Sequence, residues 1–115
     1  MDPQADPPTQ AAVRALLRTI APGSTLLSIE PVPGSYSNFT HVIDAREVDG
    51  STLRLVVRRY KVFSHYDRGE KARREFKAFE LARRHDVPAP DPLYLDDQGT
   101  LLGMPGIVTR YVKGA

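Results

Sequence analysis

Two apolar stretches on either side of Asp49-Gly50 constrain the fold of this chain more than any other feature. Residues 40–48 and 53–60 are rich in apolar and β-branched side chains, and an Asp-Gly pair between such stretches is a strong signal for a tight hairpin turn. Residues 26–32 form a third strand-like stretch that ends near a pair of prolines. We therefore expect three antiparallel strands that follow one another as a meander.

A first helix is predicted ahead of these strands. Thr9 can cap it, and Pro22-Gly23 ends it. Apolar residues recur between them at i, i+3, i+4 and i+7, the spacing of one helical face. These residues are Val13, Leu16, Leu17 and Ile20.

A second helix is predicted from about Gly69 to about Arg84, before a proline-rich stretch that cannot continue it. One side of this helix carries four apolar residues and one acid: Ala72, Glu75, Phe76, Phe79 and Ala82. The apolar residues must face the sheet, so the carboxylate of Glu75 is carried inward with them. A buried carboxylate is costly without a cation, and Arg58 or Arg59 at the end of the third strand can supply one.

Two further strands are expected after the second helix. Residues 93–95, the turn at 96–99 and Leu101-Leu102 suggest a hairpin, which Met104-Pro105-Gly106 interrupts before residues 107–112 form the last strand. The fold class is therefore α+β, a five-stranded antiparallel sheet with one packed helix plus an N-terminal helix. Asp96-Asp97 resembles a carboxylate pair for acid-base chemistry, but beside Gln98-Gly99 it is better interpreted as part of a turn.

Composition excludes several classes of protein. At 115 residues the chain is one modest domain, in which we expect residues 1–8 to form a loose tail. With 16 basic and 14 acidic residues it is not a strongly basic nucleic-acid binder, and without cysteine it has neither disulfides nor thiolate metal sites. The three histidines have no acidic partners at ligand spacing, so we expect no metal site and place them at the surface or at edges. No signal peptide or long apolar run is present, so we expect no membrane partner and a cytoplasmic location.

Several motifs in this order resemble the N-terminal, nucleotide-binding lobe of the aminoglycoside phosphotransferase family. The motifs are Gly34–Thr40, Val57-Arg58-Arg59, Arg74-Glu75, Val87-Pro88-Ala89-Pro90 and Thr109-Arg110-Tyr111-Val112-Lys113-Gly114. The resemblance covers nearly the whole chain after the tail. It implies a protein-kinase-like small lobe at residues 9–112, in a protein that transfers the γ-phosphoryl group of ATP to a hydroxyl of a small-molecule acceptor.

The resemblance also implies roles for individual residues. The loop Gly34, Ser35, Tyr36, Ser37 and Asn38 would cover the phosphates through its backbone N–H groups. Arg58 matches the strand position that touches the α- and β-phosphates, and Glu75 matches its partner on the helix. Thr109 would lie at the back of the adenine pocket, with the Arg110 carbonyl and the Val112 amide against the adenine edge.

Two positions depart from the pattern of the family. Ser35 stands where relatives often have a second glycine, and Arg58 replaces a lysine, whose compact ammonium a planar guanidinium does not simply replace. The catalytic aspartate, the Mg²⁺ ligands and the acceptor site belong in this family to a C-terminal lobe. We expect residues 113–115 to begin the linker to that lobe, so this stretch alone should not turn over. An uncovered lobe surface near Tyr111 and Val112 would favour a homodimer.

Other interpretations remain open. Residues 34–40 can be an ordinary hairpin loop, and an Arg58–Glu75 contact can be a purely structural bridge. The chain can also be a stand-alone binding or interaction module that has a kinase-like layer but ignores nucleotides. Arginines on the second helix could bind nucleic acid, but interleaved glutamates are more typical of a solvated helix face.

Overall fold

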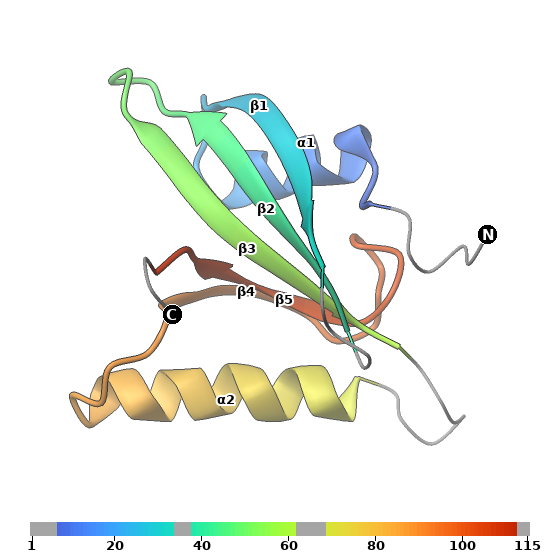
Figure 1. Cartoon of the computed structure of the whole chain (residues 1–115), viewed down its shortest axis with the longest axis vertical. Coiled ribbons are helices and arrows are strands. Elements are labelled where there is room, and N and C mark those ends of the chain that lie inside the picture. Colours follow the sequence, from blue (N-terminus) through green and yellow to red (C-terminus); the bar gives the residue numbers. More distant parts are fainter. Residues whose placement is uncertain (1–6, 34–37, 62–68, 113–115) are drawn as a thin grey trace.

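A computed structural model of the chain describes residues 7–33, 38–61 and 69–112. It shows an α+β fold, as predicted, in which two helices pack on a five-stranded antiparallel sheet (Figure 1). The elements are α1 (Gln10–Ile20), β1 (Thr25–Val32), β2 (Asn38–Arg46), β3 (Thr52–Tyr60), α2 (Glu70–Arg84), β4 (Pro92–Asp96) and β5 (Gly106–Arg110).

The sheet has the strand order β1-β2-β3-β5-β4, with every neighbouring pair antiparallel. The first three strands form the predicted meander. Asp49-Gly50 makes the turn between β2 and β3, with Gly50 at a φ of 89° and its N–H 2.9 Å from the Glu47 carbonyl oxygen. The Asp49 carboxylate accepts the Ser51 N–H at 2.9 Å, which shows why an aspartate suits this turn.

Helix α1 covers one face of the sheet. Its first turn is capped as predicted, because the Thr9 hydroxyl accepts the Ala12 N–H at 3.1 Å. The apolar side of α1 packs on every second residue of β3, since successive side chains of a strand point to opposite faces. The buried residues of this α1-side core are Val13, Leu16, Leu17, Ile43, Ala45, Leu53, Leu55, Val57, Leu102 and Val108.

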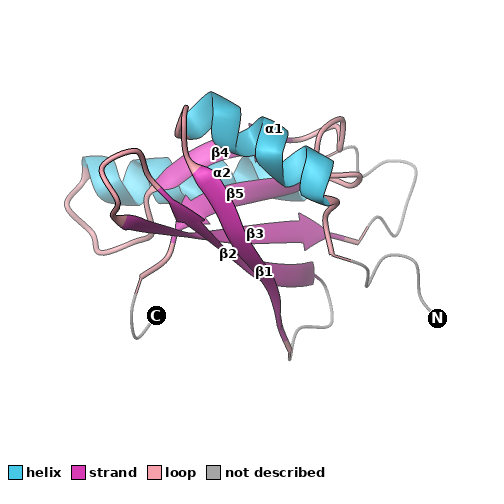
Figure 2. Cartoon of the chain, turned by 90° about the horizontal axis from the view of Figure 1, so that it is seen from above, coloured by secondary structure: helices cyan, strands magenta, loops and turns pink. Residues whose placement is uncertain are grey.

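Helix α2 lies against the other face, mainly beside β4 (Figures 1 and 2). A smaller cluster of Tyr60, Ala72 and Ile107 is buried there, with Phe76, Phe79 and Leu95 half-buried around it. The predicted inward stripe of α2 is therefore confirmed.

Both ends of α2 are fixed by backbone conformation. Gly69 precedes the helix at a φ of 80°, and a Cβ at this position would collide with the carbonyl oxygen of Asp97, so only glycine fits. At the other end the Val87 N–H bonds to the Ala82 carbonyl at 2.8 Å, with Asp86 at a φ of 58°. This is a Schellman motif, and it ends the helix before the prolines from which we predicted that end.

Leu101-Leu102 was predicted as strand but lies in turns. The reason is the buried carboxylate of Asp96, which accepts the backbone N–H groups of Thr100, Leu101 and Leu102 at 3.0, 2.9 and 2.7 Å. These bonds curl the chain and direct the Leu102 side chain into the core. They also confirm that Asp96 serves a turn.

The last strand is also shorter than predicted, because β5 ends at Arg110. Its neighbour β4 begins at Pro92, opposite Thr109, so the pairing on that side ends there.

No helix within residues 7–33, 38–61 and 69–112 is long and apolar enough to cross a membrane.

Candidate functional site

Arg58 and Glu75, the two charged residues on which the predicted site depends, belong to β3 and α2 on the same side of the sheet, but these two described residues form no ion pair with each other. Arg58 and Tyr60 lie two residues apart on one face of the strand, and Glu75 lies on the side of α2 that faces them. Arg59 is excluded as the partner of Glu75, because it lies on the opposite face. There it is 4% exposed, with Nη1 3.4 Å from the Leu102 carbonyl oxygen.

Tyr60, rather than either arginine, makes the contact with Glu75. The Tyr60 hydroxyl donates a hydrogen bond to the Glu75 carboxylate. No ion pair of 4.0 Å or less joins Arg58 to Glu75, both of which the structure describes. Sequence reasoning missed Tyr60, although its position two residues after Arg58 places it on the same face of a strand.

Tyr60 is buried in an apolar cluster, but two charged side chains, Lys71 and Glu75, also contact it. Its side chain is 2% exposed, and the Lys71 ammonium lies 5.3 Å from the centre of its ring. Burial raises the pKa of the Tyr60 hydroxyl, the bond to Glu75 and the charge of Glu75 raise it further, and the positive charge of Arg58 acts in the opposite direction. The hydroxyl therefore stays protonated and remains a donor at any physiological pH.

Two neighbouring rows of side chains cross the sheet beside this cluster. In the first row the strand register aligns Val42 of β2 with Val56 of β3 and Thr109 of β5. In the second row it aligns Thr40 with Arg58. The rows are about 6.6 Å apart, which is two residues along a strand. An apolar strip and a cation thus lie next to each other on the face that α2 leaves partly open.

Strand β1 ends and strand β2 begins at the Arg58 end of this surface. Val32 and Thr40 are the last pair between the two strands, and Asn38 opens β2 opposite Tyr60. The other predicted phosphate-loop residues, Gly34, Ser35, Tyr36 and Ser37, lie outside the described residues.

The residues predicted to contact adenine separate into two environments. Thr109 is 4% exposed and shares the face of Arg58. The side chain of Arg110 belongs to the other face, where its Nε lies 3.6 Å from the Asp91 carboxylate. Val112 follows the end of β5 and is 41% exposed.

An exposed ion pair lies at the far end of the same face. Arg54 bonds to both carboxylate oxygens of Asp44, at 2.8 and 3.1 Å, and its guanidinium carbon lies 5.3 Å from the centre of the Tyr111 ring. The Tyr111 N–H also donates to the Arg54 carbonyl at 3.0 Å. These contacts hold the chain after β5 against β3.

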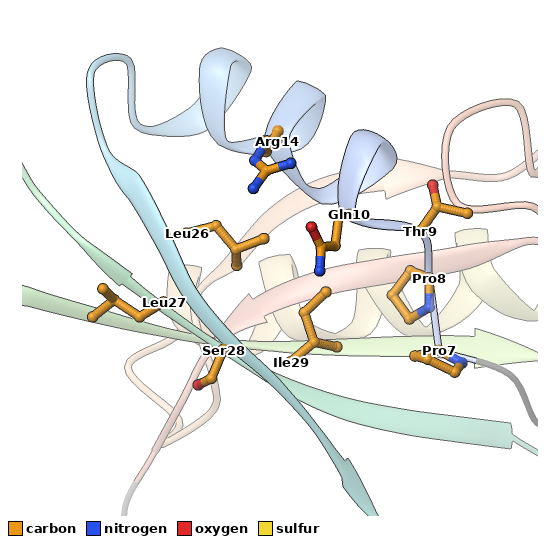
Figure 3. Close-up of a pocket in the computed structure, with 9 residues that line it drawn as sticks. All are labelled: Pro7, Pro8, Thr9, Gln10, Arg14, Leu26, Leu27, Ser28 and Ile29. Carbon is orange, nitrogen blue, oxygen red and sulfur yellow. The ribbon is translucent and has the colours of Figure 1, made fainter.

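A separate cavity of about 660 Å³ lies between the start of α1 and the edge strand β1. The Gln10 amide and the Arg14 guanidinium project from α1 toward Leu26 and Ile29 (Figure 3). Both polar residues are exposed, and the cavity lies on the α1 side of the sheet. It therefore has no part in the site around Arg58.

The expectation that all histidines lie at the surface or at edges is wrong for His41. It lies in β2, where it is 3% exposed and pairs with Val57 on the α1 side of the sheet. Burial lowers the pKa of its imidazole, and the charge of Arg59 lowers it further. No group of three or more histidine or acidic side chains placed to hold a metal ion exists within the described parts of the chain.

Comparison with known proteins identifies no relative of this chain. Neither a family model, nor a curated protein, nor a solved structure matches the chain. The resemblance to the aminoglycoside phosphotransferase lobe therefore depends on the sequence motifs of the chain alone.

Proposed function

We propose that the chain is the nucleotide-binding small lobe of a cytoplasmic, kinase-like phosphotransferase that moves the γ-phosphoryl group of ATP to a hydroxyl of a small molecule. The observation that supports this most is the order of groups on the α2 side of the sheet. An apolar row is followed, two residues along the strands, by a cation and then by a helix carboxylate.

A nucleotide laid along the strands would match this order. Its base would rest on Val42 and Val56 with Thr109 behind them, because a flat aromatic ring gains most from an apolar, half-buried surface. Its phosphates would then extend toward Arg58 and Thr40, at the end of the sheet where β1 and β2 are joined. A guanidinium offers paired donors to phosphate oxygens, which suits Arg58 to this role.

Within the described ranges, this face has no group of acidic or histidine side chains placed to hold the metal ions that phosphoryl transfer needs. Phosphoryl transfer depends on metal ions held next to the phosphates and on a residue that orients the attacking hydroxyl. In the family that the chain resembles, the second lobe supplies the Mg²⁺ ligands and the acceptor site. We therefore assign nucleotide binding to this stretch and assign turnover to the two lobes together.

A nuclear magnetic resonance titration of the ¹⁵N-labelled 115-residue chain with Mg-ATP tests the proposal at single-residue level. Binding is expected to be weak, with a Kd on the order of 1 mM, since only one wall of the site is present. Amide shifts should concentrate at Val42, Val56, Arg58 and Thr109. The α1 residue Leu16, on the closed side of the sheet, should not respond.

Two arginine variants make the titration specific. Arg58→Ala should weaken binding about tenfold or more, because it removes charge-assisted hydrogen bonds to phosphate. Arg74→Ala removes an equal charge from the solvent side of α2, where Arg74 pairs with Glu70, and should change little. Equal losses in the two variants would mean nonspecific charge attraction. No shift at any site would favour the stand-alone binding module instead.

A further inference from the structure

Strand β1 forms one edge of the sheet, and its outer side has no strand partner among the described residues. In the order β1-β2-β3-β5-β4 it pairs with β2 alone. An unpaired edge presents backbone N–H and C=O groups with which another extended chain can pair. Strand β1 can therefore accept a further strand, provided that its outer side is accessible.

A trough between α1 and β1 gives this access. The cavity of about 660 Å³ beside the start of α1 and a hollow of about 230 Å³ share Arg14 and Leu26, so they adjoin as one α1–β1 trough. Residues 26–29 line the larger part (Figure 3), and residues 24–26 line the smaller one. Because successive side chains of a strand point to opposite faces, such a run of neighbours lines one space only where the main chain forms part of its wall. The unpaired edge of β1 is thus open to the trough.

Helix α1 forms the other wall and runs antiparallel to β1. The start of the helix shares the larger part of the trough with residues 26–29, whereas Arg18 shares the smaller part with residues 24–26. Four residues of a helix advance about 6 Å, and two residues of a strand advance about 6.6 Å. Arg14 and Arg18, which are four residues apart, therefore match alternate residues of a strand laid in the trough.

The charge of the α1–β1 trough is positive. Arg14 and Arg18 are exposed, neither takes part in an ion pair within the described ranges, and no acidic side chain is among the residues that line the trough. The one acid of β1, Glu30, pairs with Val42 and so lies on the opposite face. Since a guanidinium binds a carboxylate through paired hydrogen bonds, the trough complements an acidic ligand.

We propose that the α1–β1 trough binds an extended acidic peptide of a partner protein, which joins the five-stranded sheet as a further strand beside β1. Carboxylates at positions i and i+2 of the peptide pair with Arg14 and Arg18, and main-chain hydrogen bonds to β1 fix its register. The half-buried Leu26 and Ile29 supply an apolar floor. This interaction does not depend on nucleotide binding, because the trough has no part in the surface around Arg58.

A second copy of the chain suits the trough less well than an acidic peptide. Pairing of β1 with β1 of another copy would bring the arginines of both copies to one seam, where like charges repel. The bulge between Leu26 and Ser28 and the missing N–H of Pro31 would also interrupt a long ladder. A short peptide avoids Pro31 and needs only a few bonds on either side of the bulge.

Two blocked peptides of equal composition test the register. The glutamates of Ac-Thr-Glu-Val-Glu-Val-Thr-NH₂ share one face of an extended chain, whereas those of Ac-Thr-Glu-Glu-Val-Val-Thr-NH₂ point to opposite faces. The first peptide, titrated into the ¹⁵N-labelled 115-residue chain, should shift the amides of Leu26 and Ser28 and leave that of Tyr94, on the other edge strand, in place. The second should bind about fivefold more weakly, because only one carboxylate reaches an arginine. Equal affinities, or no saturating shift in β1 up to about 1 mM of the first peptide, would overturn the proposal.

Variants of the two arginines test the charge contacts. Arg14→Gln combined with Arg18→Gln should raise the Kd of the first peptide about tenfold, whereas Arg74→Gln, on the solvent side of α2, should change it less than about twofold. Urea denaturation should show equal stability for these variants, since all three side chains are exposed. An unchanged Kd in the double variant would contradict the assignment.

Methylated peptides distinguish strand addition from binding by side chains alone. Alternate N–H groups of an extended chain point to opposite edges, so N-methylation of both glutamates or of both valines removes donors from one edge only. One of these two peptides should lose at least about tenfold in affinity, and the other should bind as before. Loss in both or in neither would overturn strand addition. A dimer in sedimentation equilibrium, with β1 amides that broaden as protein concentration rises, would assign the edge to a second copy instead.

Discussion

The two faces of the sheet differ in what covers them. On the α1 side, Val13, Leu16 and Leu17 of the helix are at most 2% exposed and close over an apolar core. On the other side, α2 buries only Ala72 of its own residues and leaves the rows around Val56 partly open. One face of the same strands thus holds the fold together, while the other displays charged and polar groups that a ligand could reach.

The difference originates in the two helix sequences. The inward side of α1 is entirely apolar, so it can sit flat on the sheet. The inward side of α2 contains Glu75, and its two large apolar residues, Phe76 and Phe79, are only half-buried. A carboxylate in the middle of a packing face costs stability unless it is bonded, and the Tyr60 hydroxyl supplies that bond to Glu75.

Two adjacent valines of β3, each replaced in a separate variant, give the most direct test of the difference between the two faces of the sheet. They also give the largest expected effect. Val57 is 0% exposed on the α1 side, and Val56 is half-buried on the open side. Val57→Ala should lower the free energy of unfolding by about 2–3 kcal/mol, since it removes buried methyl groups and leaves a cavity. Val56→Ala, the same chemical change one residue away, should cost about 1 kcal/mol or less.

Urea denaturation followed by circular dichroism measures both variants. Their m-values should match that of the parent chain, so that the difference reflects stability rather than a change of the unfolded state. Equal losses in the two variants would contradict the distinction between a closed and an open face.

A smaller effect is expected from the buried histidine of the closed face. The pKa of His41 lies below its ordinary value of 6.5 because of burial and the charge of Arg59. Below pH 6.5 the unfolded chain therefore binds a proton that the folded chain resists, so stability is fully present at neutral pH and falls as the pH drops toward the folded pKa. The loss should be smaller than that of Val57→Ala, because only one proton is involved and each pH unit below the ordinary pKa costs at most about 1.4 kcal/mol.

Urea denaturation at a series of pH values between about 7.5 and 5 checks this expectation, in the range where histidine titrates. His41→Gln should flatten the fall in stability. His85→Gln, at the exposed end of α2, should leave it intact. A parent chain whose stability is constant across this range would show that His41 takes up its proton as easily as a solvated histidine.

Periodicity was enough to predict most of the fold. The spacing of apolar residues located α1, and the Asp49-Gly50 pair located the turn between β2 and β3. These features are local, so a sequence displays them directly. Leu101-Leu102 was mistaken for strand because the cause of its turn, the Asp96 carboxylate, lies up to six residues away and acts through backbone N–H groups that no pattern reveals.

The sequence predicted which residues of β3 and α2 form the candidate site, but it did not predict which of them contact one another. The period of two along β3 gave a cation opposite a helix carboxylate, but two arginines in succession left the choice of face open. Only the packing of Arg59 toward Leu102 resolves it. Tyr60 escaped notice because a tyrosine at the end of a strand is usually explained by packing, and its bond to Glu75 depends on how α2 docks. The buried position of His41 was also missed, although the period of two places His41 on the same face of β2 as the core residues Ile43 and Ala45.

The smallest expected effect concerns the ion pair at the exposed end of the open face. Asp44 and Arg54 make two hydrogen bonds, but their side chains are 21% and 50% exposed, so water and salt screen the attraction between them. Asp44→Asn should lower the free energy of unfolding by about 0.2–1 kcal/mol at low salt and by less as salt is added. Urea denaturation at about 0.01 and 1 M ionic strength, where the screening length falls from about 30 to 3 Å, measures the change. A loss above about 2 kcal/mol that salt does not reduce would mean that this end of the face is as closed as the α1 side, because only a desolvated pair resists screening in that way.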